Sequence, residues 1–220
     1  QIFLGALGHD LRGPLTAVVF SADALASRTR DTPYARQVDR ILNGGLRMTR
    51  LLDDLLAYSR SKLGDGMVIQ QEPCELGEAL GEEVELLRAA LPGTAFGFET
   101  SGDTRGDFDA SRLREAVHNL ATNAAKYGDD GTEVAIRVAG TPEQVLISVR
   151  NAGAPITDEA LKVMFDPLRR GSREATKDEN VSLGLGLFLV REIARAHGGR
   201  VDATSEGGFT TFAIALPRGG

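Results

Sequence analysis

The first third of the chain repeats its apolar residues at intervals of three and four. They fall at Leu4, Leu7, Leu11, Leu15, Val18, Ala22 and Leu25, and then at Val38, Ile41, Gly45, Met48, Leu52, Leu55 and Ser59. This spacing places each set on one side of a helix. Between the sets, Asp31 or Thr32 can serve as an N-cap, with Pro33 at the first helical position. The second helix is expected to continue through Gly44 and Gly45, at about 1 kcal/mol per glycine.

Two such helices form a hairpin, and one hairpin alone leaves each apolar stripe half covered. Two hairpins that pack as a four-helix bundle cover both stripes, so we predict a homodimer. The helical pattern is already running at Gln1. We therefore expect the chain to be a piece of a longer protein.

The period changes after the polar segment "SRSKLGDG", and we place a connector between the two domains at residues 64–72. Alternating or apolar runs predict strands at 67–72, 95–100, 133–140, 144–151, 200–205 and 209–217. Helical patterns lie at about 76–91, 109–127, 157–164 and 184–197. Because strands and helices mix without strict alternation, we predict an α/β sandwich in which helices cover one face of a mixed sheet. The fold class is thus α+β, with a helical hairpin at 1–63 and a second domain at 73–220.

Composition narrows the possible partners. The net charge of −6 and the lack of a basic stripe argue against a general nucleic-acid binder. Cys74 is the only cysteine, which excludes an internal disulfide and suits a reducing cytoplasm. No apolar run approaches the roughly 18 residues of a membrane span. We expect a cytoplasmic chain without membrane contact.

The first candidate for chemistry is a histidine in the stretch "GALGHDLRGPL". His9 lies two positions from both Leu7 and Leu11, about 200° around a helix, so it should face solvent. Pro14 cannot donate to the carbonyl of Asp10 and should bend the helix one turn beyond His9. An exposed imidazole is a competent nucleophile near neutral pH. An idle surface histidine is the alternative, and the proline favours a functional one.

The segment "HDLRGPL" resembles the H-box of sensor histidine kinases. That resemblance implies that His9 is the phospho-acceptor and that Asp10 is a general base or an orienting group. Adjacent helix residues do not face each other, so the role of Asp10 rests on the family alone. In the family, phosphatase activity often uses a Thr or Asn four residues after the histidine. Gly13 occupies that position here, which predicts weak phosphatase activity.

The segment "RLREAVHNLATNAAKYG" predicts a helix with Glu115, Asn119, Asn123 and Lys126 on one face. A solvated polar face is the simpler interpretation, but two asparagines on one stripe of an apolar helix are unusual. Carboxamide oxygens suit Mg²⁺ and an ammonium suits phosphate. The segment resembles the N-box of the histidine-kinase ATPase domain. This implies that Asn123 binds Mg²⁺, that Asn119 and Lys126 contact phosphates, and that Tyr127 lies near the nucleotide.

Two glycine-containing segments complete the resemblance. "VRNAGAPI" is similar to the G1 box, with Gly153 present and Asn151 in place of the usual aspartate, a version also found among phytochrome-like kinases. An asparagine can still accept from the adenine amino group and donate to the adjacent ring nitrogen. Losing the charge-assisted bond is expected to weaken affinity by about 1 kcal/mol. "SLGLGL" resembles the G2 box, where the backbone of Gly184, Leu185 and Gly186 approaches phosphates at a helix start.

Three further features lie around the G2 box. Phe165 and Pro167 look like the F-box, and the charged run at 169–180 looks like a lid over the nucleotide. His197, ahead of two glycines, is interpreted as a cation and cap signal at a helix C-terminus.

The resemblance covers nearly the whole chain. It implies a dimerisation and phosphotransfer hairpin followed by a Bergerat-type (GHKL) ATP-binding domain, as the cytoplasmic portion of a larger sensor. The implied activity is autophosphorylation of His9 with ATP and Mg²⁺, then transfer to an aspartate of a response-regulator receiver domain. One alternative is a dimeric scaffold that binds nucleotide without catalysis. Another is a gyrase-, chaperone- or anti-sigma-type ATPase, which would leave the His9 hairpin unexplained.

Overall fold

The structure is a computed structural model that describes residues 2–30, 32–62, 66–167 and 184–218. For residues 2–10, 50, 54, 57 and 60–62 it describes the backbone alone. The chain divides into two compact units, with the division after residue 65. The elements are α1 (Ile2–Thr29), α2 (Ala35–Lys62), β1 (Glu72–Glu75), α3 (Leu76–Ala90), β2 (Ala95–Ser101), β3 (Arg105–Phe108), α4 (Ala110–Tyr127), β4 (Glu133–Gly140), β5 (Gln144–Ala152), α5 (Asp158–Val163), α6 (Gly186–Ala196), β6 (Arg200–Glu206) and β7 (Phe209–Pro217). This is the predicted α+β class.

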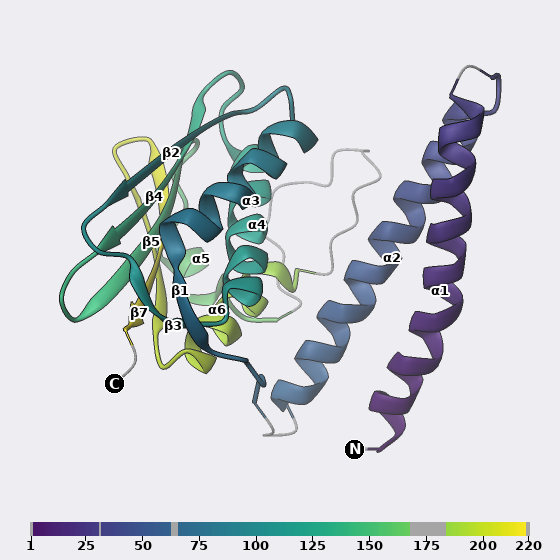
Figure 1. The fold of residues 1–220 in the computed structure, drawn as a ribbon. Coiled ribbons are helices and arrows are strands. Elements are labelled where there is room, and N and C mark those ends of the chain that lie inside the picture. The colour runs from purple at the N-terminus through teal and green to yellow at the C-terminus, as the bar shows by residue number, and fades with distance from the viewer. Residues whose placement is uncertain (1, 31, 63–65, 168–183, 219–220) are drawn as a thin grey trace. The chain divides into compact units, whose positions relative to one another are not determined.

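The first unit is a hairpin of the two predicted helices, which lie side by side (Figure 1). Helix α1 runs without interruption through Pro14, and α2 runs through Gly44 and Gly45 as expected. At Gly45 the helices approach closely, since a Cβ there would lie 2.7 Å from Val19 Cγ2. The glycine that weakens α2 locally is therefore what lets α1 pack against it.

The start of the second helix differs from the prediction. Helix α2 begins at Ala35 and not at Pro33. The Thr32 hydroxyl accepts from the Tyr34 N–H at 3.3 Å and donates to the Thr29 carbonyl at 2.8 Å. These bonds hold residues 32–34 in a turn against the last turn of α1. Asp31, the other candidate cap, lies outside the described residues.

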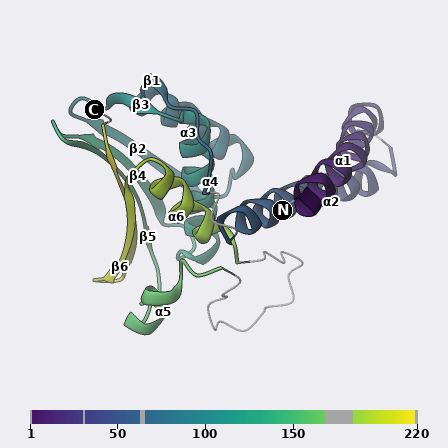
Figure 2. The same cartoon turned by 90° about the horizontal axis from the view of Figure 1, so that it is seen from below.

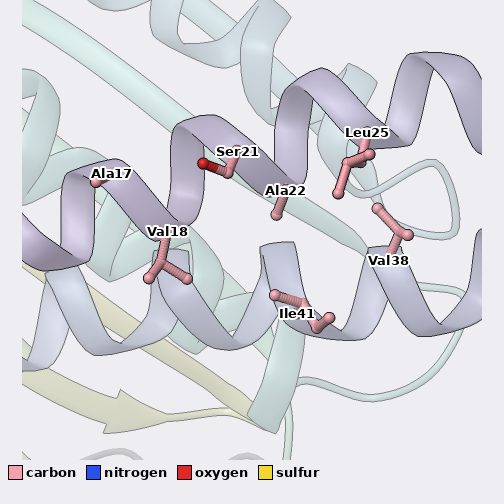
Figure 3. A pocket seen from close by; sticks show the side chains of 7 residues that line it. All are labelled: Ala17, Val18, Ser21, Ala22, Leu25, Val38 and Ile41. Carbon is pink, nitrogen blue, oxygen red and sulfur yellow. The ribbon is translucent and has the colours of Figure 1, made fainter.

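The hairpin leaves much of its apolar surface uncovered. Ala22, Val38 and Leu56 are buried, whereas Ile41 is 55% and Met48 52% exposed. Figure 3 shows an apolar groove between the two helices, with Leu25 opposite Val38. Its lining residues are Ala17, Val18, Ser21, Ala22, Leu25, Val38 and Ile41. The half-covered stripes predicted from the sequence are thus present.

The second unit is a two-layer sandwich built on a five-stranded sheet of order β2-β4-β5-β7-β6. Strands β2 and β4 are parallel and the other neighbours are antiparallel. Helices α3, α4 and α6 lie on one face of this sheet (Figure 2). Their apolar stripes meet the inward side chains of the strands, and Leu80, Leu120, Ile147 and Ile193 are fully buried. The five long predicted strands are confirmed.

The strand predicted at 67–72 is wrong. Residues 67–71 belong to no helix or strand, and the strand β1 starts only at Glu72. It pairs antiparallel with β3, which the sequence pattern did not predict. Each of these strands has four residues, too few for an alternating pattern to stand out. Among the described helices, none is both long enough and apolar enough to cross a membrane.

Candidate functional site

Helix α4 carries four of the predicted nucleotide-site residues, namely Asn119, Asn123, Lys126 and Tyr127. Asp109 caps its N-terminus by accepting from the Arg112 N–H at 3.1 Å. Its apolar stripe is buried against the sheet and α6, which leaves Asn119 and Asn123 half-buried at the border. Glu115, the acidic residue of the predicted face, forms an ion pair with Arg112 at 2.8 Å. The polar edge is therefore an ordered feature of the packed helix.

The start of α6 lies against Asn119. The Asn119 Nδ2 donates to the Glu115 carbonyl at 3.1 Å, and a Cβ at Gly186 would lie 3.2 Å from Asn119 Oδ1. Gly184 precedes it with φ +68°, a conformation that favours glycine. No described side chain caps the first turn of α6. Its free N–H groups and the helix dipole make this end suited to an anion.

The next polar groups along α4 are open to a ligand. Within the described parts of the chain the Asn123 carboxamide has no hydrogen-bond partner. The Lys126 ammonium lies 5.1 Å from the centroid of the Tyr127 ring, and Tyr127 is 51% exposed. A carboxamide oxygen, an ammonium and an aromatic ring are thus presented within one helical turn.

Asn151 sits where the end of β5 meets the end of α4, and it is only 6% exposed. Its Nδ2 donates to the Ala152 carbonyl at 2.9 Å, and that carbonyl also accepts from the Asp129 N–H at 3.0 Å. These bonds fix the orientation of the carboxamide and leave its oxygen as an acceptor. A Cβ at Gly153 would lie 3.3 Å from the Tyr127 carbonyl, a tight contact that favours a small residue at this position.

The candidate site residues thus lie toward both ends of the second half of α4. Asn119, beside α6, precedes Tyr127, beside β5, by eight positions, or about 12 Å of helix at 1.5 Å per residue. Leu185 has a buried side chain, 1% exposed, and can offer a ligand only its backbone. Phe165 packs edge-on against Phe212, with ring centroids 6.3 Å apart. The predicted lid at 169–180 lies outside the described residues.

His197 is the C-cap residue of α6, as the sequence predicts, but the interpretation of its ring as a cation needs correction. It is 3% exposed, and its Nε2 accepts from the Asp109 N–H at 3.0 Å. Since a backbone N–H can only donate, the ring proton resides on Nδ1, which faces the Ile193 carbonyl at 2.8 Å. His197 therefore acts as a buried hydrogen-bond acceptor and not as a helix-end cation. The local sequence pattern predicts neither the Asp109–His197 hydrogen bond nor the hydrogen bond from Asn151 to the Ala152 carbonyl.

The H-box lies on α1, in the other unit. His9 and Asp10 belong to the helix, and their side chains lie outside the described residues. One turn later Gly13 is exposed, and a Cβ built there would meet nothing within 4 Å. Arg12 contacts Asp53 of α2 at 2.5 Å.

Comparisons with known proteins match both units. A family model for the histidine kinase-, DNA gyrase B- and HSP90-like ATPases matches residues 108–220, and one for the His kinase A (phospho-acceptor) domain matches residues 1–64. The bacteriophytochrome of Pseudomonas aeruginosa is 30% identical over 217 residues, which are 99% of this chain and 29% of that protein.

Two solved structures extend the similarity. Full-length ShkA in complex with AMPPNP is 26% identical with a TM-score of 0.75, over 97% of this chain and 45% of that one. The histidine kinase ThkA in complex with the response regulator TrrA is 22% identical with a TM-score of 0.65, over 98% of this chain and 62% of that one.

This chain spans less than half the length of the curated relatives that it matches. The ATPase family model covers more than half of the chain, and the phospho-acceptor model covers the hairpin before it. The chain therefore belongs to the histidine kinase-, DNA gyrase B- and HSP90-like ATPase family, in the two-domain arrangement of a sensor histidine kinase.

Proposed function

We propose that this chain phosphorylates His9 from ATP and passes the phosphoryl group to an aspartate of a response-regulator receiver domain. The observation that carries the proposal is the arrangement around α4, where a fixed acceptor at Asn151, an open carboxamide at Asn123 and an uncapped helix α6 adjoin one helix. The phospho-acceptor hairpin preceding it supplies the nucleophile. We place the hairpin at 1–63, the connector at 64–72 and the ATP-binding domain at 73–220.

In this proposal the nucleotide lies along α4. Adenine binds near Tyr127 and donates its amino hydrogen to the Asn151 oxygen, and the phosphates meet the backbone of Gly184–Gly186, with Asn119 and Lys126 beside them. The partnerless Asn123 carboxamide suits Mg²⁺, which neutralises charge on the transferred phosphoryl group when bound. The ShkA complex with AMPPNP supports an adenine nucleotide here.

The reaction consists of two successive phosphoryl transfers. An imidazole nitrogen of His9 forms a bond to the γ-phosphorus while the bond from that phosphorus to the β–γ bridging oxygen breaks, and ADP leaves. Asp10 accepts or orients the proton that the imidazole loses. The phosphoryl group then moves from the imidazole to a carboxylate oxygen of the receiver domain.

Label transfer from γ-labelled ATP tests the proposal. Wild-type chain with Mg²⁺ should take up acid-labile, base-stable label, and His9→Gln should take up none while binding a fluorescent ATP analogue as tightly as wild type. Binding without label in the wild type would favour the non-catalytic scaffold. Label that persists in His9→Gln would contradict the assignment of His9.

Asn151 is proposed to preserve a preference for adenine. Since the Ala152 carbonyl holds Nδ2, the oxygen of Asn151 faces the base, and guanine would present a second acceptor, O6, to it. Asn151→Ala should weaken ATP binding by about 1 kcal/mol and narrow the preference for ATP over GTP. Equal ATP and GTP affinities in the wild type would refute this role. The similarity to a bacteriophytochrome supports interpreting the residue as a phytochrome-like variant of the G1 box.

The same proposal implies two partners, a second copy of the chain and a receiver domain. The exposed groove of the hairpin supports a homodimer, and the ThkA–TrrA complex supports a receiver domain as the acceptor. Weak phosphatase activity is proposed because Gly13 has no side chain to position a water. Gly13→Thr has space for its side chain and should accelerate decay of the phosphorylated regulator relative to Gly13→Ala. Rapid decay with the wild type would contradict the proposal.

A further inference from the structure

The connector ahead of the second unit ends beside the N-cap of α4. Strand β1 pairs antiparallel with β3 so that Glu72 lies opposite Phe108. Gln70, two residues before Glu72, is therefore brought next to Asp109, one residue after Phe108. The Gln70 N–H donates to Asp109 Oδ2 at 2.9 Å.

Asp109 forms two more bonds with its other polar groups. Its Oδ1 accepts from the Arg112 N–H at 3.1 Å, which caps α4. Its backbone N–H donates to Nε2 of the buried His197 at 3.0 Å, and His197 Nδ1 contacts the Ile193 carbonyl of α6 at 2.8 Å. One residue thus joins the connector, the start of α4 and the end of α6.

This arrangement exceeds what a helix cap requires. An N-cap needs one side-chain oxygen, and Asn or Ser provides it about as well as Asp. Here the second oxygen of the same rigid carboxylate is used by the connector, so the side chain cannot rotate away from Gln70 without also changing the cap. Helices α4 and α6 are the two that hold Asn119 and Gly186 of the candidate site.

We propose that Asp109 is a positioning residue that fastens the connector to the two nucleotide-site helices, so that the ATP-binding domain is presented to His9 on a defined tether. The inference rests on the proposed function, since it concerns the geometry of the same phosphoryl transfer. A tether with fewer conformations loses less entropy when the two reacting groups meet. The bond should therefore affect the rate of transfer more than the affinity for ATP.

The test removes the Gln70–Asp109 bond from either side. Gln70→Pro deletes the N–H donor, and Gln70→Ala is its matched control because it keeps that donor. Asp109→Asn retains the cap and removes the second carboxylate oxygen. In the full chain we expect Gln70→Pro and Asp109→Asn to lower kcat for autophosphorylation about fivefold, the equivalent of one hydrogen bond, with KM for ATP within about twofold. Gln70→Ala should match the wild type.

Hydrogen exchange gives a readout that does not require activity. The Gln70 amide should be protected in the wild type and in Gln70→Ala, and should exchange faster in Asp109→Asn. Equal kcat in Gln70→Pro and Gln70→Ala would overturn the proposal. So would a parallel rise of KM in Gln70→Pro and Asp109→Asn, which would indicate a merely structural cap. If the wild type takes up no label, the proposed function fails, and unchanged exchange in Asp109→Asn would separately refute the fastening.

Discussion

Both units of the chain contain amphipathic helices, but they differ in how far the apolar stripes of those helices are buried. In the hairpin, the buried apolar side chains among the described residues are Ala22, Val38 and Leu56. In the ATP-binding unit, α4 buries its entire stripe, and Leu113, Val117 and Leu120 are 0% exposed. A helix needs two or more neighbours to enclose such a stripe, and among the described elements α2 packs mainly against α1. The second unit encloses its apolar stripes within one chain, whereas the described part of the hairpin leaves its stripes partly exposed.

The largest effect should come from a substitution that leaves a cavity in the core of the second unit. Leu120→Ala removes a fully buried side chain between α4 and the sheet and should destabilise the second unit by about 3 kcal/mol. Leu86→Ala, at a position that is 64% exposed on α3, is the control and should cost little. Urea denaturation, with nucleotide binding as the signal of folded protein, measures the stability of both variants. Equal midpoints for the two variants would contradict a tightly packed core in the second unit.

A smaller effect is expected from a substitution in the apolar groove of the hairpin. Ile41 lines the hairpin groove, and a charge there would be desolvated if a second copy covered it. Ile41→Asp should raise the dimer dissociation constant at least about tenfold, or 1.4 kcal/mol, without changing ATP binding. Sedimentation measures the dissociation constant, and Arg40→Ala, exposed and outside the groove, is the control. An unaltered dimer in Ile41→Asp would show that a different surface completes the hairpin.

The smallest effect concerns an exposed ion-pair cluster in the second unit. Hydrogen bonds from Arg105 and then from Arg218 hold the pKa of Asp103 well below its usual value. Because the folded-state pKa is the lower one, the stabilisation is present above the unfolded value of about 4 and is lost as the pH falls below it.

The variant Asp103→Asn tests this sign. Wild type should be slightly more stable than Asp103→Asn at pH 7, and the difference should shrink as the pH falls through about 4. Thermal unfolding at a series of pH values measures it. A difference that stays constant down to pH 3 would show that charge at Asp103 does not contribute.

The sequence by itself determined the helices and long strands and the polar edge of α4. Helical spacing predicted α1, α2 and α4, and alternation predicted β4, β5 and β7, because both periods are local properties of the chain. The order of the N-box, G1-box and G2-box segments likewise indicated which residues would meet a nucleotide. Asn119 and Gly186 do adjoin, as do Gly153 and Tyr127.

Only the tertiary structure decided how particular side chains are used. Gly45 is required by Val19 of the other helix, and the carboxamide of Asn151 is oriented by a carbonyl that also receives the Asp129 N–H. The bonds of Asp109 reach 39 residues back to Gln70 and 88 residues forward to His197. No local period encodes such partners, because they meet only when the short β1–β3 pair and the packing of α6 bring distant segments together.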